Sequence, residues 1–167
     1  MSDINTQDIR DYLVGLVNEK EDLTLDVDTL TFGEPVLVDA TVLDFSRPGV
    51  RNSSVKLTRP AAAGQLEVDL TVKYNRLSLE QMFRLRSPDF ADTIGTHLTN
   101  YLDAINERTG GRLRAEDIVE VEIRDQVAVT LAARPDSLYA FGSVVINIMP
   151  ENSVFVRLIV DGGEVAE

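Results

Sequence analysis

The chain has 167 residues, of which 44% are hydrophobic, and a formal net charge of −12, a composition typical of a folded globular protein. The acidic balance argues against a nucleic-acid partner, because phosphate groups repel a negative surface. The sequence contains no cysteine, which excludes disulfides, thiolate metal sites and cysteine nucleophiles.

The sequence shows no signal for secretion or membrane insertion. Its first residues form neither the basic nor the apolar region of a secretory signal. Its apolar runs are shorter than the roughly 18–20 residues of a membrane helix. We therefore expect a protein that is made in the cytoplasm and has no membrane partner.

The first predicted element is an amphipathic helix near the amino terminus. Its apolar residues recur at the spacing of one helix face: Ile9, Tyr12, Leu13, Leu16 and Val17. Further along, residues 39–53 include Pro48 and Gly49 and predict an exposed loop or an extended hairpin. Apolar and polar residues alternate in 55–58 and again in 68–74, which predicts two strands.

Residues 77–91 are expected to be a linker that contains a short helix. The Ser-x-x-Gln pattern from Ser78 to Gln81 is typical of a helix amino terminus. Ser87-Pro88 ends that helix.

The second half repeats the order of the first. A helix face is predicted by Leu98, Tyr101, Leu102 and Ile105. Gly110 and Gly111 end this helix. Strands are predicted at 127–131, 142–148 and 152–160.

The two halves align at constant offsets. Val17-Asn-Glu-Lys aligns with Ile105-Asn-Glu-Arg 88 residues later, and the same offset places Leu25 on Leu113. The returning strands align at an offset of 74, and we assign the difference of 88 minus 74, or 14 residues, to the insertion at 39–53. The predicted fold is α+β, with two diverged copies of a helix-plus-antiparallel-strands unit packed together. The units are expected at 1–76 and 92–160, followed by a flexible tail at 161–167.

Residues that could support catalysis or metal binding are scattered. His97 is the single histidine, and the acidic stretch 116–125 is the other feature that could serve an enzyme. An enzyme should lose activity when His97 is replaced or when Glu120 and Glu122 are neutralised. Asp26 and Asp28 form an Asp-x-Asp pair but lack the third acidic position and the glycine of a calcium loop. A solvated acidic face or the capping of a short turn explains these carboxylates as well. We therefore predict no catalytic residue, no metal site and no cofactor.

The insertion supplies the candidate interface residues. Phe45, Arg47 and Arg51 lie within it, and arginine is favoured among residues that anchor protein interfaces. The alternative is that this segment is an ordinary surface loop.

A longer pattern in the second half resembles a known module. The helix and the "I-N-x-x-T-G" string at 105–110 precede an acidic "E-D-I-V" string at 116–119, and "V-T-L-A-A" and "G-S-V" strings follow at 129–133 and 142–144. This order resembles a small module of virion structural proteins of large tailed bacteriophages. The string "V-K-Y-N-R-L-S-L" at 72–79 resembles the link that follows such modules.

The first half departs from this pattern. It carries Glu21-Asp22 where the module has Thr-Gly, and Val68-Asp69 where the module has Gly-Ser. The motifs are structural, so the resemblance brings no catalytic residues with it.

The resemblance implies a non-catalytic bacteriophage virion structural protein, whether of the tail or baseplate, of the neck, or associated with the capsid as a decoration protein. Its expected partners are other virion proteins and copies of itself in a symmetric assembly. Its expected location is the virion, after synthesis in the cytoplasm of the bacterial host. The alternative is an assembly chaperone or adaptor module that acts outside the virion.

Overall fold

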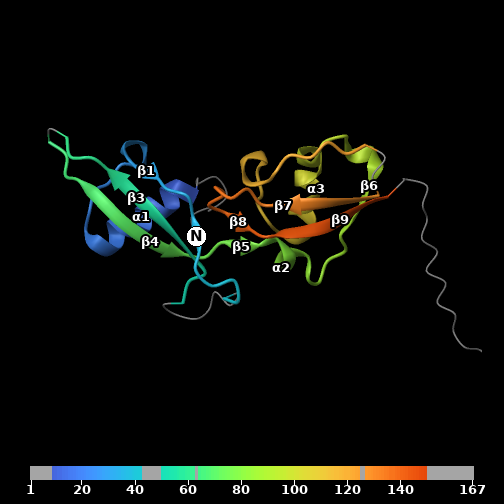
Figure 1. Cartoon of the computed structure of the whole chain (residues 1–167), viewed down its shortest axis with the longest axis horizontal. Helices are drawn as coiled ribbons and strands as arrows, with labels where there is room; N and C mark the ends of the chain where they lie inside the picture. The colour runs from blue at the N-terminus through green and yellow to red at the C-terminus, as the bar shows by residue number, and fades with distance from the viewer. Residues whose placement is uncertain (1–8, 43–49, 63, 125–126, 150–167) are drawn as a thin grey trace, which may run out of the picture.

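The computed structural model describes residues 9–42, 50–62, 64–124 and 127–149. It is a mixed α+β fold with several sheets, drawn out into two halves that lie end to end (Figure 1). None of the described helices has the length and apolar character that a bilayer crossing requires.

The first half is a small antiparallel sheet covered on one face by a helix. Its elements are α1 (Ile9–Glu21), β1 (Thr31–Phe32), β2 (Val36–Leu37), β3 (Ser53–Arg59) and β4 (Val68–Tyr74). β3 is central, because β1 and β2 pair with one of its edges and β4 pairs with the other. The inward side chains of this sheet meet the helix in a core made of Leu13, Val17, Val55, Leu57 and Tyr74, with Leu138 added from the second half.

The buried face of α1 differs from the predicted one. Leu13, Val14 and Val17 are buried, whereas Tyr12 and Leu16 are 42% and 41% exposed. Successive residues on a helix point about 100° apart, so a buried stripe that also includes Val14 turns Tyr12 and Leu16 away from the core. The buried stripe is thus rotated from the apolar face that the spacing predicts.

The second half is built around a mixed sheet. Its elements are β5 (Leu77–Ser78), α2 (Leu79–Phe83), β6 (Asp89–Ala91), α3 (Leu102–Thr109), β7 (Ala128–Ala132), β8 (Ala140–Phe141) and β9 (Ser143–Met149). β9 is central, with β7 antiparallel on one edge and β6 parallel on the other, and β5 pairs in parallel with β8. Its core is larger, and Phe90 makes edge-to-face contacts there with Phe83 and Tyr101, at ring-centroid distances of 6.3 and 6.2 Å.

Residues 77–91, which the sequence suggests as a linker, contain β5, α2 and β6. Leu79, Met82, Phe83 and Phe90 from this segment are buried in the larger core. The predicted short helix is present, and Ser78 Oγ accepts a hydrogen bond from the Gln81 N–H at 3.3 Å.

In each half an asparagine of the main helix holds the loop that follows. Asn18 exchanges two hydrogen bonds with the backbone of Leu25, at 2.9 and 2.7 Å. Asn106 makes the same two with Leu113, both at 2.8 Å. Gly110, with φ of +72°, lets the chain leave α3 in the left-handed conformation that favours glycine.

After each of these loops the chain forms a short 3-10 turn and then runs alongside the sheet. The turns are Val27–Thr29 and Ala115–Asp117, and each begins two residues after the leucine. After the first turn in the sequence, Thr31 pairs with Thr58 of β3. After the second turn, the Val119 N–H donates to Ala132 O of β7 at 2.9 Å.

Candidate interaction sites

A buried arginine joins the two halves. Arg76 follows β4 and is only 4% exposed. Its Nε donates to Ser53 Oγ at 2.9 Å in the first half, and its Nη1 donates to Ser137 O at 3.2 Å in the second. Its guanidinium also lies over the Phe141 ring, 5.7 Å from the centroid. Burial lowers the pKa of Arg76.

Asn52 completes this polar junction. Its side chain is fully buried, donates to Arg76 O at 2.8 Å and accepts from the Arg76 N–H at 2.8 Å. Buried polar groups that satisfy one another in this way fix one arrangement of the chains that carry them. Together with Leu138 in the first core, the junction sets how the halves meet.

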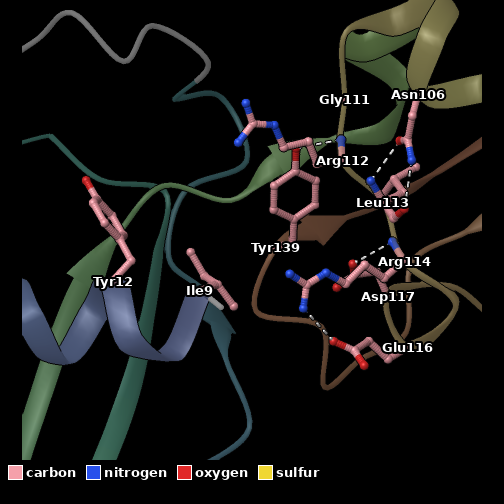
Figure 2. A pocket seen from close by; sticks show the side chains of 10 residues that line it. All are labelled: Ile9, Tyr12, Asn106, Gly111, Arg112, Leu113, Arg114, Glu116, Asp117 and Tyr139. Carbon is pink, nitrogen blue, oxygen red and sulfur yellow. Dashed lines mark hydrogen bonds and ion pairs between the residues drawn. The ribbon is translucent and has the colours of Figure 1, made fainter. Parts of the chain in front are cut away.

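A cleft of about 580 Å³ opens beside this junction (Figure 2). Ile9 and Tyr12 of α1 form one side, and the loop after α3 together with Tyr139 forms the other. The residues on the second side are Asn106, Gly111, Arg112, Leu113, Arg114, Glu116, Asp117 and Tyr139.

Local contacts shape the wall that faces α1. Tyr139 Oη accepts a hydrogen bond from the Arg112 N–H at 3.0 Å, and burial nevertheless raises the pKa of the Tyr139 hydroxyl. A Cβ at Gly111 would lie 2.3 Å from Met82 Cε, so the loop packs closely on α2. Arg114 and Glu116 form an exposed ion pair at 3.4 Å.

Asp117 is the buried carboxylate of the cleft. Its Oδ1 accepts from the Ser137 hydroxyl at 2.8 Å, and its Oδ2 accepts from the Arg114 N–H at 3.0 Å. Burial raises the pKa of Asp117, and these two hydrogen bonds oppose the rise. Both oxygens are thus engaged in holding the loop in place.

A second recess of about 270 Å³ adjoins the cleft and shares Ile9, Glu116 and Asp117 with it. Its far side carries Arg134, which makes a two-pronged ion pair with Asp136 at 2.9 and 3.1 Å. The Arg134 hydrogen bonds lower the pKa of Asp136. Aromatic, apolar and arginine side chains around one groove suit the recognition of a protein segment.

The outer faces of the antiparallel strand pairs β3–β4 and β7–β9 differ in charge. In the first half the outward side chains of β3 and β4 include Lys56, Asp69 and Lys73, and Lys56 pairs with Asp69 at 3.1 Å. In the second half the outward side chains of β7 and β9 carry no charge, among them Ala128, Thr130, Ala132, Ser143, Val145 and Asn147. A carboxylate borders this face from the adjacent strand β6, because Asp89 Oδ1 accepts a hydrogen bond from Asn147 Nδ2 at 2.7 Å. Val145 at the middle of this second face is 55% exposed.

Of the three interface residues predicted in the insertion, the structure describes Arg51. Phe45 and Arg47 are outside the described residues. Arg51 is half-buried, and its Nη1 donates to Val50 O at 2.8 Å. Arg51 is not among the residues that line either recess.

The residues considered for catalysis lie on the surface. His97 precedes the turn that leads into α3, its N–H donates to Asn100 Oδ1 at 3.0 Å, and its Nδ1 lies 3.7 Å from Glu120 Oε1. Partial desolvation acts to raise the pKa of Glu120, but hydrogen bonds from Thr99 and Val121 lower it overall. Glu122 instead pairs with Arg124 at 2.8 Å.

The Asp-x-Asp pair caps a turn. Asp26 Oδ1 accepts from the Asp28 N–H at 3.1 Å at the start of the first 3-10 turn. Within the described part of the chain, no three His, Asp or Glu side chains are grouped closely enough to hold a metal ion.

No local sequence pattern indicates the cleft, because its sides come from α1 and from residues about a hundred positions later. The uncharged outer face of β7 and β9 could be predicted from the sequence. Alternation in 127–131 and 142–148 already assigns Thr130, Ser143 and Val145 to one outward face without charge.

Comparison with known proteins places the chain in a family. No curated protein and no solved structure matches it significantly. A family model matches residues 1–162, which is nearly the whole chain, so the chain belongs to the family of unknown function DUF7941.

Proposed function

We propose that the chain is a non-catalytic structural protein of a bacteriophage virion, built from two diverged copies of one α+β unit and acting through protein–protein contacts. The virion part of the proposal comes from the module that residues 105–144 resemble. The contact part comes from the surfaces of the two sheets and from the cleft.

The duplication is supported by matching details at the offsets found in the sequence. The paired hydrogen bonds of Asn18 and of Asn106 lie 88 residues apart, as do the two 3-10 turns. The strand register agrees at the offset of 74, since Ser54 lies opposite Lys73 and Ala128 lies opposite Asn147. Two unrelated folds would have no reason to share both the asparagine hydrogen bonds to the following loop and the strand register.

The observation that carries the contact proposal is the uncharged outer face of β7 and β9. The protein has 28 acidic and 16 basic residues, so an exposed to half-buried face of β7 and β9 without charge, bordered by Asp89 of β6, stands out. Depletion of charge is the compositional mark of the buried centre of a protein interface. The equivalent positions of the first sheet carry Lys56, Asp69 and Lys73, as a solvated face does.

The virion proposal is tested by quantitative mass spectrometry of purified virions from the phage that encodes the chain. We expect the protein in the particles, and its copy number relative to the major capsid protein separates a ring from a lattice. Absence from virions together with abundance in infected cells would refute the proposal in favour of an assembly chaperone or adaptor.

The contact face is tested by exchanging equivalent residues between the sheets. Thr130→Lys gives the second sheet the residue that the first sheet holds at the same place, Lys56, so the fold should tolerate it. We expect Thr130→Lys to reduce incorporation into virions by at least tenfold. The matched control Lys56→Thr should be incorporated as the wild type is, because it changes only a solvated face. Equal incorporation of both variants would show that the β7–β9 face makes no contact.

A further inference from the structure

One edge of the first sheet is unpaired among the described residues. β3 has neighbours on both sides, whereas β4 pairs only with β3. The Gly33 N–H donates to Lys56 O at 2.8 Å, so Lys56 directs its backbone groups toward β1. Backbone direction alternates along a strand, so Val55 directs its groups toward β4.

This alternation identifies the free backbone groups of β4. Val55 lies opposite Val72, so Val72 directs its N–H and C=O toward β3. Thr71 and Lys73 therefore direct theirs to the opposite edge. An exposed row of such groups is a template for one more strand.

The second sheet shows how this edge is covered when it is complete. The Asn147 N–H of β9 donates to Pro88 O at 2.9 Å, and β6 continues that pairing in parallel with β9. At the offset of 74, Asn147 corresponds to Lys73 of β4. No described segment holds the place of β6 in the first sheet.

We propose that residues 153–160 of a second copy of this chain pair with the outer edge of β4. This segment reads Ser-Val-Phe-Val-Arg-Leu-Ile-Val, the β-branched and aromatic composition of a strand. Eight extended residues span about 26 Å, enough to lie along the seven residues of β4. At the offset of 88, residues 1–3 of the same chain correspond to β6. They read Met-Ser-Asp and lack an aromatic residue such as Phe90, which β6 buries in its core.

The place of the segment in the sequence favours pairing between copies. The segment follows β9, and β9 ends in the half of the molecule opposite β4 (Figure 1). The attachment point of the donor and the acceptor edge thus lie in opposite halves of each copy. Such a head-to-tail contact is heterologous, and repetition closes it into a ring or extends it into a filament. The inference goes beyond the proposed function and holds whether or not the assembly is part of a virion.

The pairing is tested by amide hydrogen exchange in the full chain, measured by NMR at two protein concentrations. The amide protons of Leu70 and Val72 point toward β3 and should exchange slowly at both concentrations. Thr71 and Lys73 should exchange slowly only at the higher concentration, where copies associate. Fast exchange of Thr71 and Lys73 at both concentrations would show that the edge is unused. Slow exchange at both would assign the edge to a segment of the same chain. Either result overturns the proposal.

Two variants of the full chain, studied by sedimentation velocity, identify the edge and the donor. Thr71→Pro removes an outward N–H while leaving the β3 ladder intact, so it should abolish association, and Thr71→Ala should associate as the wild type does. Leu158→Asp should also abolish association, and Arg157→Gln should keep it. Association of Leu158→Asp at the wild-type level would overturn the proposal, even if Thr71→Pro failed to fold.

Discussion

The hydroxyl of Ser137 donates a hydrogen bond of 2.8 Å to the buried carboxylate of Asp117, and the backbone carbonyl of the same serine accepts from Arg76. Ser137 therefore links the floor of the cleft to the junction between the halves. Its Oγ also accepts from the N–H groups of Tyr139 and Ala140, at 3.2 and 3.1 Å. One small side chain thus holds both the wall of the cleft and the strand β8.

We predict that Ser137→Ala destabilises the fold by about 1–3 kcal/mol, because it leaves one oxygen of a buried carboxylate without its partner. The free energy of unfolding from urea denaturation gives the value. The control Ser143→Ala, on the exposed face of β9, should stay within about 0.5 kcal/mol of the wild type. Equal stability of both variants would show that Asp117 does not depend on Ser137.

Asn106→Ala should also destabilise the fold, by about 1–2 kcal/mol, since it removes both hydrogen bonds to the backbone of Leu113. Asn18→Ala should lose a similar amount, because Asn18 makes the same two bonds with Leu25. Thermal unfolding of both variants, with the exposed neighbour Glu107→Ala as the control, provides the comparison. A stable Asn106→Ala beside a weakened Asn18→Ala would contradict the equivalence of the two loops.

Leu138→Ala should cost about 2–5 kcal/mol and weaken the coupling between the halves. Leu138 is buried in the core of the first half, although it precedes β8 of the second half in the sequence. We expect the wild type to unfold in one transition, and Leu138→Ala to show separate transitions when followed with a probe in each half. A single coincident transition in the variant would mean that the Arg76 junction alone couples the halves.

The stability of the protein should fall in alkaline solution because of Tyr74. Burial raises the pKa of Tyr74 to about 12, from an ordinary value near 10, and its hydroxyl has no hydrogen-bond partner among the described residues. Because the pKa is raised in the folded state, the contribution of Tyr74 to the free energy of unfolding is fully present below pH 10 and is lost as the pH rises toward 12. The two-unit shift corresponds to about 2–3 kcal/mol.

Tyr74→Phe isolates this effect. The variant should be as stable as the wild type at pH 7, since the lost hydroxyl makes no hydrogen bond there, and should lose less stability between pH 10 and 12. Urea denaturation across that pH range measures the difference. Burial also raises the pKa values of Tyr101 and Tyr139, so part of the alkaline loss should remain. An unchanged alkaline loss in Tyr74→Phe would exclude Tyr74 as a source.

The strands and helices of this chain were largely readable from the sequence. Alternation predicts a strand at 68–74, where β4 lies, and one at 142–148, within one residue of β9. Gly110 ends α3 as predicted. These features depend on local backbone geometry, which repeats every 3.6 residues in a helix and every two in a strand.

The candidate sites were less readable. Helical spacing places Tyr12 on one apolar face with Leu13 and Val17, whereas Tyr12 lines the cleft. Residues 77–91 carried turn signals that suggested a linker, yet Phe90 is buried at the centre of the larger core. In both cases the deciding contacts come from segments distant in the sequence, and no local pattern specifies them.

The sequence by itself determined the α+β class, the acidic surface and the paired asparagine motifs, because each follows from residue types and their spacing. The tertiary structure decided that β6 covers the edge of β9, that Leu138 crosses into the first core and that the cleft opens between α1 and the loop after α3. These relationships depend on which distant surfaces bury one another most completely. That choice is made by the packing of the whole chain, because burial of apolar surface is non-directional and carries no local signature.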